Sequence, residues 1–349
     1  MTRTPHAPAA PASAAPGTTR VRSALRTLAI VACLPYIALK TAWIAGSHIG
    51  VPENSSLLDH RATMIAANGL SVLMDSAVVV IAFLLTRPWG RRVPAWLLAL
   101  PMWAATGLLL PIMTGYPLQL LVRAVGAGGE PAPGASTRAF LDEWVFGVVY
   151  SGFIVQGLAL GALFTLYAGD RWGHLWRGAL RDLPYSPTAP ALRVTAVAAS
   201  LTALVPGTLH LLWATGSTSG LNTTRIAERT GDFYALEAVY ALFVAVAVAG
   251  ALLLAFRRRS AMPLRVPLAL AWGGSAATAC WGGWLSLSTL TGVDDLADRP
   301  TAAMVLTYAV QMLVGMLVLT LSTYFLAERA EQAERAERAD GTPPPGRPA

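Results

Sequence analysis

The sequence is poor in charge. Asp, Glu, Lys and Arg make up only 13% of its 349 residues, against roughly 25% in a typical soluble domain. Hydrophobic residues make up 54%, and the mean hydropathy is +0.52. This balance excludes an ordinary soluble domain and predicts a protein whose main partner is the lipid bilayer.

Cysteines and catalytic motifs are also scarce. The two cysteines, Cys33 and Cys280, lie inside apolar stretches, where free thiols behave as small core residues. The chain has no GxxxxGK[ST] loop, no HExxH pair and no GxSxG turn, which are the motifs of common ATPases, zinc proteases and serine hydrolases. We therefore predict no cofactor, no metal site and no catalytic residue. A membrane-embedded enzyme acting on lipid-linked substrates stays open without a motif in its favour.

Eight long apolar runs dominate the sequence. Each is close to the roughly 20 residues that a helix needs to cross the hydrocarbon core of a bilayer. The runs are continuous and do not alternate, which favours helices over barrel strands. We therefore predict an all-α membrane protein with eight transmembrane helices, near residues 25–47, 63–86, 93–114, 144–168, 192–215, 233–256, 266–290 and 303–326.

The arginines predict the orientation of these helices. Most lie in the N-terminal segment and in every second loop, as at Arg91, Arg92 and Arg257. Positive residues are retained on the cytoplasmic side of membrane proteins, so we expect both termini in the cytoplasm and the protein in the cell membrane. The net charge is +7, but the arginines do not gather on one polar domain, and no nucleic-acid partner is predicted.

Composition divides the chain into five parts. The segment between the two halves is expected to form a helix on the membrane surface, because Trp172, Trp176 and Leu183 recur at helical spacing among arginines. The segment after the last run is expected to extend its helix, and it is a candidate surface for a cytoplasmic protein partner. The parts are a disordered cytoplasmic tail (1–22), a first four-helix transmembrane unit (23–170), the interfacial helix with a proline-rich linker (171–191), a second four-helix unit (192–326), and a charged cytoplasmic helix with a disordered tail (327–349).

Two similar stretches suggest an internal repeat. The sequence LPYIALKTAWIAGSHIG at 34–50 returns 170 positions later as LVPGTLHLLWATGSTSG at 204–220. Since four helices bring the chain back to its starting side, two such units would be parallel repeats related by an axis along the membrane normal. Chance similarity among apolar helices is the alternative. The aligned pairs are Trp43 with Trp213, Gly46 with Gly216, Ser47 with Ser217, Gly50 with Gly220 and Lys40 with His210; the fourth and last runs also share Gln156 and Gln311.

The ends of the first and fifth runs carry the sequence Trp-x-x-Gly-Ser-x-x-Gly, at 43–50 and 213–220. With this sequence, its Ala- and Arg-rich composition and its eight apolar runs, the chain resembles uncharacterised multi-pass membrane proteins of actinobacteria. The resemblance covers most of residues 25–326. It implies an integral membrane protein and brings no catalytic residues.

Four ionisable residues lie where a membrane makes them costly. A charge near the bilayer centre costs about 2.5–3.5 kcal/mol even on an insertion scale, so such residues usually face the interior of the bundle. Lys40 and Asp75 in the first unit, like His210 and Glu237 in the second, place a base on the first helix and an acid on the second. We predict a buried pair in each unit. For Lys40, a side chain that reaches outward to the membrane surface is the alternative.

Further polar and aromatic residues share the faces of these four. The predicted site is a polar pocket between the units, opening toward the outer surface, with the two tryptophans at its mouth or in the interfacial aromatic belt. It suits a transport-type or ligand-binding protein for a small polar or amphipathic molecule. The alternative is a structural or regulatory subunit whose polar residues only lock helix packing. The candidate ligand-binding or proton-relay residues are Lys40, Asp75, His210, Glu237, Tyr240, Asn68, Trp43 and Trp213.

Overall fold

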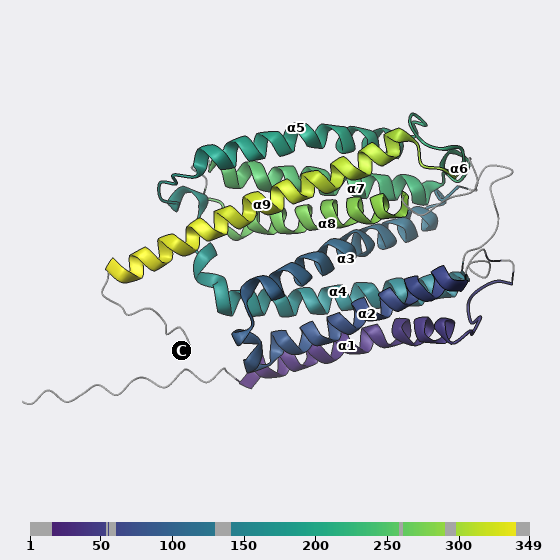
Figure 1. The fold of residues 1–349 in the computed structure, drawn as a ribbon, viewed down its shortest axis with the longest axis horizontal. Coiled ribbons are helices and arrows are strands. Elements are labelled where there is room, and N and C mark those ends of the chain that lie inside the picture. The colour runs from purple at the N-terminus through teal and green to yellow at the C-terminus, as the bar shows by residue number, and fades with distance from the viewer. Residues whose placement is uncertain are drawn as a thin grey trace, which may run out of the picture.

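The computed structural model of the protein describes residues 16–53, 55, 61–129, 141–257, 261–289 and 298–339. Over these residues the chain is helical, apart from loops and one isolated bridge between Ala179 and Pro263. The long helices are α1 (Pro16–Ile44), α2 (Arg61–Thr86), α3 (Ala95–Ala124), α4 (Glu143–Trp172), α5 (Ala189–Ala214), α7 (Gly231–Phe256), α8 (Arg265–Thr289) and α9 (Ala302–Ala339), and the short elements are η2 (Pro88–Arg92), η3 (Gly173–Trp176), η4 (Leu180–Asp182) and α6 (Thr223–Ala227) (Figure 1).

Seven of the long helices are long and apolar enough to cross a membrane, namely α1 to α5, α7 and α9. The predicted class, an all-α multi-pass membrane protein, is thereby confirmed. α8 has 25 residues but is not among the seven, since its sequence is rich in Gly, Ala and Ser. The predicted count of eight transmembrane helices therefore requires that α8 also crosses the membrane.

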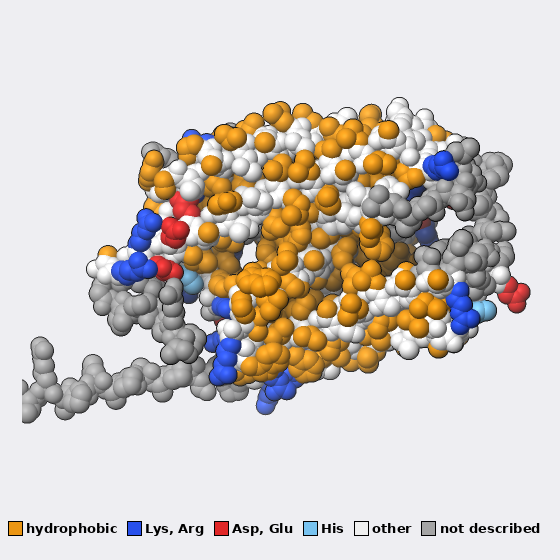
Figure 2. Space-filling view, in the orientation of Figure 1, with side chains coloured by type: hydrophobic (Ala, Val, Ile, Leu, Met, Phe, Trp, Pro, Cys, Tyr) orange, Lys and Arg blue, Asp and Glu red, His pale blue; other side chains and the backbone are white. Residues whose placement is uncertain are grey.

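The long helices lie side by side and alternate in direction (Figure 1). One end of the bundle, which we call the arginine-rich end, holds the first residues of α1, α3, α5 and α8. There Arg22 of α1 pairs with Asp170 of α4 at 2.6 Å, and Arg91 approaches the same carboxylate at 3.5 Å. We call the opposite end the arginine-poor end. Hydrophobic side chains cover much of the face between the two ends (Figure 2).

The helices form two groups of four, with α1 to α4 in the first group and α5, α7, α8 and α9 in the second. In each group the first helix packs against the second and the fourth, and the third packs against the fourth. The groups meet where α3 packs against α7 and α8. At this seam a Cβ on Gly107 would overlap the backbone of Ala276, and the Trp103 indole donates to Ser275 Oγ at 3.0 Å. Close backbone approach therefore joins the two groups.

α8 lies between α3, α7 and α9. A Cβ on Gly274 would overlap the backbone of Ala247 in α7, and one on Gly282 would lie only 2.5 Å from the backbone nitrogen of Met312 in α9. No residue of the stretch 270–283 is exposed. The glycines thus allow α8 to sit where a helix with larger side chains would not fit.

The interfacial helix predicted after the first unit is wrong. α4 ends at Trp172, and the short 3-10 turns η3 and η4 follow. Gly178 between them has a φ of +92°. The backbone beside it pairs with the segment before α8, since Leu180 N donates to Met262 O at 3.0 Å and Leu264 N donates to Gly178 O at 3.1 Å. These tertiary hydrogen bonds replace the helical ones that the periodicity suggested.

Helix boundaries differ from the prediction at other places as well. α1 already begins at Pro16, so residues 16–22 belong to a helix and not to a tail. α3 continues to Ala124 through Pro117, well beyond the predicted end of its apolar run. α9 continues to Ala339, which confirms the predicted helical extension. The tails predicted over 1–15 and 340–349 lie outside the described residues.

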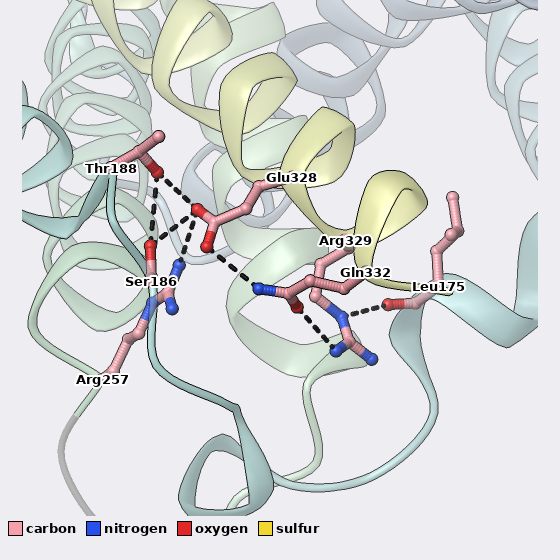
Figure 3. Close-up of polar contacts among 7 residues, drawn as sticks. All are labelled: Leu175, Ser186, Thr188, Arg257, Glu328, Arg329 and Gln332. Carbon is pink, nitrogen blue, oxygen red and sulfur yellow. Dashed lines mark hydrogen bonds and ion pairs between the residues drawn. The ribbon is translucent and has the colours of Figure 1, made fainter. Parts of the chain in front are cut away.

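The extension of α9 is anchored at the arginine-rich end by Glu328 (Figure 3). Its carboxylate accepts hydrogen bonds from Ser186 Oγ at 2.6 Å and from the Thr188 hydroxyl. Arg257, just after α7, approaches the same oxygen at 3.5 Å. Next to it, Arg329 Nε donates to Leu175 O at 3.2 Å and Gln332 Nε2 donates to Glu328 Oε1 at 3.1 Å. One buried acid therefore ties the last helix to the linker between the groups and to the end of α7.

Candidate functional site

The turns after α1 and α5 have the same hydrogen bonds. In each, the tryptophan indole donates to the carbonyl oxygen six residues later, at 2.7 Å for Trp43 and 2.9 Å for Trp213. The last glycine of each turn is left-handed, with φ +71° at Gly50 and +80° at Gly220. Both tryptophans are buried. They hold the turns, and they do not stand exposed at a pocket mouth or in an aromatic belt.

His210 of α5 is fully buried, with an exposure of 0%. Its Nδ1 lies 2.5 Å from Glu237 Oε2 of α7, and its Nε2 lies 2.8 Å from Gln311 Oε1 of α9. The predicted pair of His210 and Glu237 is therefore formed, and a glutamine from the fourth helix of the group completes it. The rings of Trp213 and Tyr240 lie against the imidazole, with centroids at 5.4 and 5.2 Å. The imidazole thus contacts side chains of α5, α7 and α9.

Two protonation states fit this geometry. With protons on both nitrogens, the imidazolium donates to the Glu237 carboxylate and to Gln311 Oε1. When Nε2 has lost its proton, the Gln311 amide can flip and donate its N–H to this nitrogen. The flip is possible because the oxygen and nitrogen ends of an amide have nearly the same shape. The cluster can therefore hold or release a proton and keep both hydrogen bonds.

Glu237 and Tyr240 also line a cleft near the arginine-poor end. Its volume is ≈ 230 Å³. Asp232 in its wall is ion-paired with Arg123 of α3, whereas Glu237 depends on His210. The other lining residues are Gln119, Arg225, Glu228, Thr230, Phe233, Leu236, Leu285 and Tyr308. Glu237 thus connects the buried histidine to a polar cleft.

In the first group the predicted pair of Lys40 and Asp75 is not among the ion pairs of the described residues. Lys40, the chain's single lysine, has its Nζ 5.0 Å from the centre of the Tyr36 ring and 4.9 Å from that of the Trp43 ring, a cation–π arrangement. Counted from the helix ends in the structure, Lys40 lies about 6 Å and Asp75 about 21 Å from the arginine-poor ends of their helices. This difference in depth exceeds the reach of a lysine side chain.

Asp75 has a different partner. It is 5% exposed and accepts a hydrogen bond from Gln156 Nε2 of α4 at 3.2 Å. Asn68 is also buried on α2, about 10 Å from Asp75 along the helix. The glutamine of α4 thus contacts the acid of its group, whereas the glutamine of α9 contacts the base, His210.

The eight predicted site residues therefore do not converge on one cavity between the groups. His210, Glu237 and Tyr240 meet in the second group, and Lys40 and Asp75 lie at separate depths in the first. Sequence reasoning missed the cleft residues after α5, such as Arg225 and Asp232. Arg225 lies in the short helix α6 and Asp232 in the first turn of α7. Hydropathy carries no signal there, and only the polar character of 222–232 pointed to them.

Within the described residues, no group of three or more His, Cys, Asp or Glu side chains is arranged to hold a metal ion. No family model, curated protein or solved structure matches the chain. Its function has therefore to be inferred from the two polar clusters.

Proposed function

We propose that this protein is a transport-type membrane protein that binds a small cation in the cleft of the second group in exchange for a proton of the His210–Glu237 pair. The observation that carries the proposal is a fully buried histidine, held at 2.5 Å by an acid that also lines the cleft. Histidine is the side chain whose charge ordinarily changes near physiological pH.

The charge that Glu237 presents to the cleft depends on this proton, beside the opposite charges of Arg225 and Glu228 that also line it. While His210 is protonated, it neutralises Glu237, just as Arg123 neutralises Asp232. When the proton leaves, Glu237 keeps a negative charge that faces the cleft. A charge in a partly buried site is costly unless it is paired, so a bound cation stabilises the deprotonated form. Proton and cation therefore compete for Glu237.

The size and lining of the cleft favour a small ammonium compound. A volume of ≈ 230 Å³ lies below the roughly 300–1,000 Å³ of pockets for drug-sized ligands. Tyr240, Tyr308 and Phe233 line it, and aromatic faces attract alkylammonium groups. A small primary or quaternary ammonium ion matches both features.

The placement in the membrane is part of the proposal. We infer that the arginine-rich end faces the cytoplasm, that α8 spans the bilayer as the eighth helix, and that the groups are parallel repeats. Two observations support the repeat: the matching indole bonds of Trp43 and Trp213, and the contacts of the fourth helix of each group with the first and the third. A helix surrounded by α3, α7 and α9 needs few apolar side chains of its own, which supports the place of α8.

Proton release on cation binding tests the function. Tetramethylammonium chloride is added to the purified protein in weakly buffered solution near neutral pH, with a pH indicator and with sodium chloride as the matched salt. We expect close to one proton released per protein, and none from Glu237→Gln or His210→Gln. Glu53→Gln, an exposed change near the same end, should behave as the unsubstituted protein. No release from the folded, unsubstituted protein contradicts the proposal. Uptake of labelled tetramethylammonium into proteoliposomes under a proton gradient then separates transport from binding.

A regulatory or structural subunit is the second candidate. The observation that favours it is the α9 extension, whose exposed pairs Glu331–Arg335 and Glu334–Arg338 follow the anchor at Glu328. If this segment only serves a protein partner, truncation after residue 332 leaves cation-dependent proton release unchanged. If release is absent in both forms and a partner is lost on truncation, the subunit hypothesis takes precedence.

A further inference from the structure

The first group contains a buried acid that the function proposed for the cleft does not use. Asp75 lies fourteen residues after the start of α2 and eleven before its end, so it is near the middle of the helix. It is 5% exposed, and no ion pair of the described residues includes it. A lone carboxylate at such a depth carries a large desolvation cost. The carboxyl group therefore needs a cation or a proton.

The neighbouring helices do not place a cation against it. On α1, the titratable groups near enough to interact electrostatically with Asp75 are Cys33, Tyr36 and Lys40. The Cys33 thiol donates to Ala29 O at 3.1 Å, and Lys40 rests over its aromatic neighbours. On α4, Gln156 contacts the acid, and Tyr150 lies almost two turns away with its ring against Tyr116. Asp75 is thus left with one neutral amide as its hydrogen-bond donor.

The side chain of Gln156 lacks one hydrogen-bond donor. Its side chain is 2% exposed, its Nε2 donates to Asp75 Oδ1, and its Oε1 is buried without a partner. An ionised carboxylate would add lone pairs beside this unpaired oxygen and no donor. A neutral carboxyl group has one O–H to donate. Acid and amide can then pair through two hydrogen bonds, N–H to the acid carbonyl and O–H to the amide carbonyl.

We propose that Asp75 and Gln156 form a proton-binding site at the centre of the first group, in which the protonated carboxyl group donates to Gln156 Oε1. The proton comes from solvent and returns to it, and no other bond changes. The site lies between α2 and α4, which also pack directly on each other and both pack on α1. Loss of the proton would leave an unpaired charge between these helices and weaken their contact. The proposal does not rest on the function of the cleft, since it concerns other helices.

Infrared difference spectroscopy on the full-length protein in a bilayer tests the site. At neutral pH we expect a carbonyl-stretch band of a protonated carboxyl group that Asp75→Asn removes. Gln156→Leu should shift this band to higher frequency, because the carboxyl group loses its hydrogen-bonded partner. Equal spectra for the unsubstituted protein and Asp75→Asn in this region would mean that Asp75 is ionised, and would overturn the proposal. So would a band that sodium chloride abolishes and choline chloride of equal ionic strength does not, because the site would then bind sodium.

Unfolding at different pH values supplies a second measurement. Unfolded Asp75 is ionised at neutral pH, whereas the folded protein is proposed to keep the proton. The folded state then binds more protons, so this group's contribution to stability falls as pH rises. Between about pH 5 and about pH 8, Asp75→Asn should lose less stability than the unsubstituted protein, and the exposed control Glu143→Gln should lose as much. Identical pH dependence in Asp75→Asn and the unsubstituted protein contradicts the site.

Discussion

The two groups of helices build different polar centres on the same scaffold. In both, the first helix packs on the second and the fourth, the third packs on the fourth, and the same tryptophan-anchored turn follows the first helix. In the second group base and acid meet at 2.5 Å, whereas in the first they lie apart. The cause is the depth of the acid, since Glu237 comes six residues after the start of α7 and Asp75 fourteen after the start of α2. A shared backbone thus positions helices, and the place of one acid decides which chemistry they hold.

The largest loss of stability is expected from replacing the acid of the His210–Glu237 pair. Glu237→Leu leaves His210 buried without its charged partner, and removing one member of a buried pair costs about 3 kcal/mol. Asp75→Asn should cost less than about 1 kcal/mol, because the amide replaces a group we propose to be neutral. Denaturant unfolding in detergent measures both. Equal losses in the two variants would mean that both acids are ionised or that neither is.

The fourth helices of the two groups provide the next contrast. Glu328 lies at the arginine-rich end, where the extension of α9 begins, and is buried. Asp170 near the end of α4 is about half exposed. Glu328→Ala leaves Ser186, Thr188 and Arg257 without their acceptor, for a loss of about 2 kcal/mol. Asp170→Ala should cost less than about 1 kcal/mol, as exposed ion pairs do. Limited proteolysis should also cut the 173–188 linker faster in Glu328→Ala only, and faster cutting in both variants would refute a specific anchor.

The turns after α1 and α5 test the similarity between the two groups. Gly50→Ala and Gly220→Ala combine a left-handed φ with a collision, against Val145 in one turn and Ala303 in the other. Each should cost about 2 kcal/mol. At Gly46 and Gly216 a Cβ meets no atom closer than 3.9 Å, so alanine there should cost only the backbone preference, about 1 kcal/mol. Thermal unfolding of the four variants should give the same ranking in both turns. A different ranking would argue against a repeated unit.

The smallest effect on stability is expected from a test of orientation. Cys33 and Cys280 are replaced by alanine, and single cysteines are introduced as His48→Cys and Arg335→Cys, both at exposed positions at opposite ends. In intact cells a membrane-impermeant maleimide should label His48→Cys and not Arg335→Cys. The second variant loses one exposed ion pair, worth at most about 0.5 kcal/mol. The reverse labelling pattern would place the arginine-rich end outside the cell.

Periodicity and length were enough to predict the helices, since the runs are set by the thickness of a bilayer. The pair of His210 and Glu237 was also predictable, because both residues lie within two turns of the arginine-poor ends of adjacent helices. The absence of the Lys40–Asp75 pair was not predicted, since depth along two helices depends on where each helix begins. α1 and α2 have boundaries that composition gives only to within a few residues.

Other features depended on tertiary contacts that a sequence pattern does not contain. The segment after Trp172 has the spacing of a helix, but Leu180 and Leu264 pair their backbones with partners more than eighty residues away. The roles of Gln156 and Gln311 were visible only as a repeated residue type. Their positions, Gln156 against Asp75 and Gln311 against His210, follow from the packing of the fourth helix of each group on its neighbours.

The glycines of α8 have a consequence for how this protein is made. A helix whose middle is covered by other helices gains little from lipid, and its modest hydropathy means that the bilayer alone retains it weakly. If α8 spans the membrane as proposed, its insertion should then depend on α7 and α9, which supply the surfaces that Gly274 and Gly282 fit. A chain that ends after α8 should leave this helix accessible to protease on one side of the membrane, and the addition of α9 should protect it. Assembly of the second group would thus be completed only when its last helix has been synthesised.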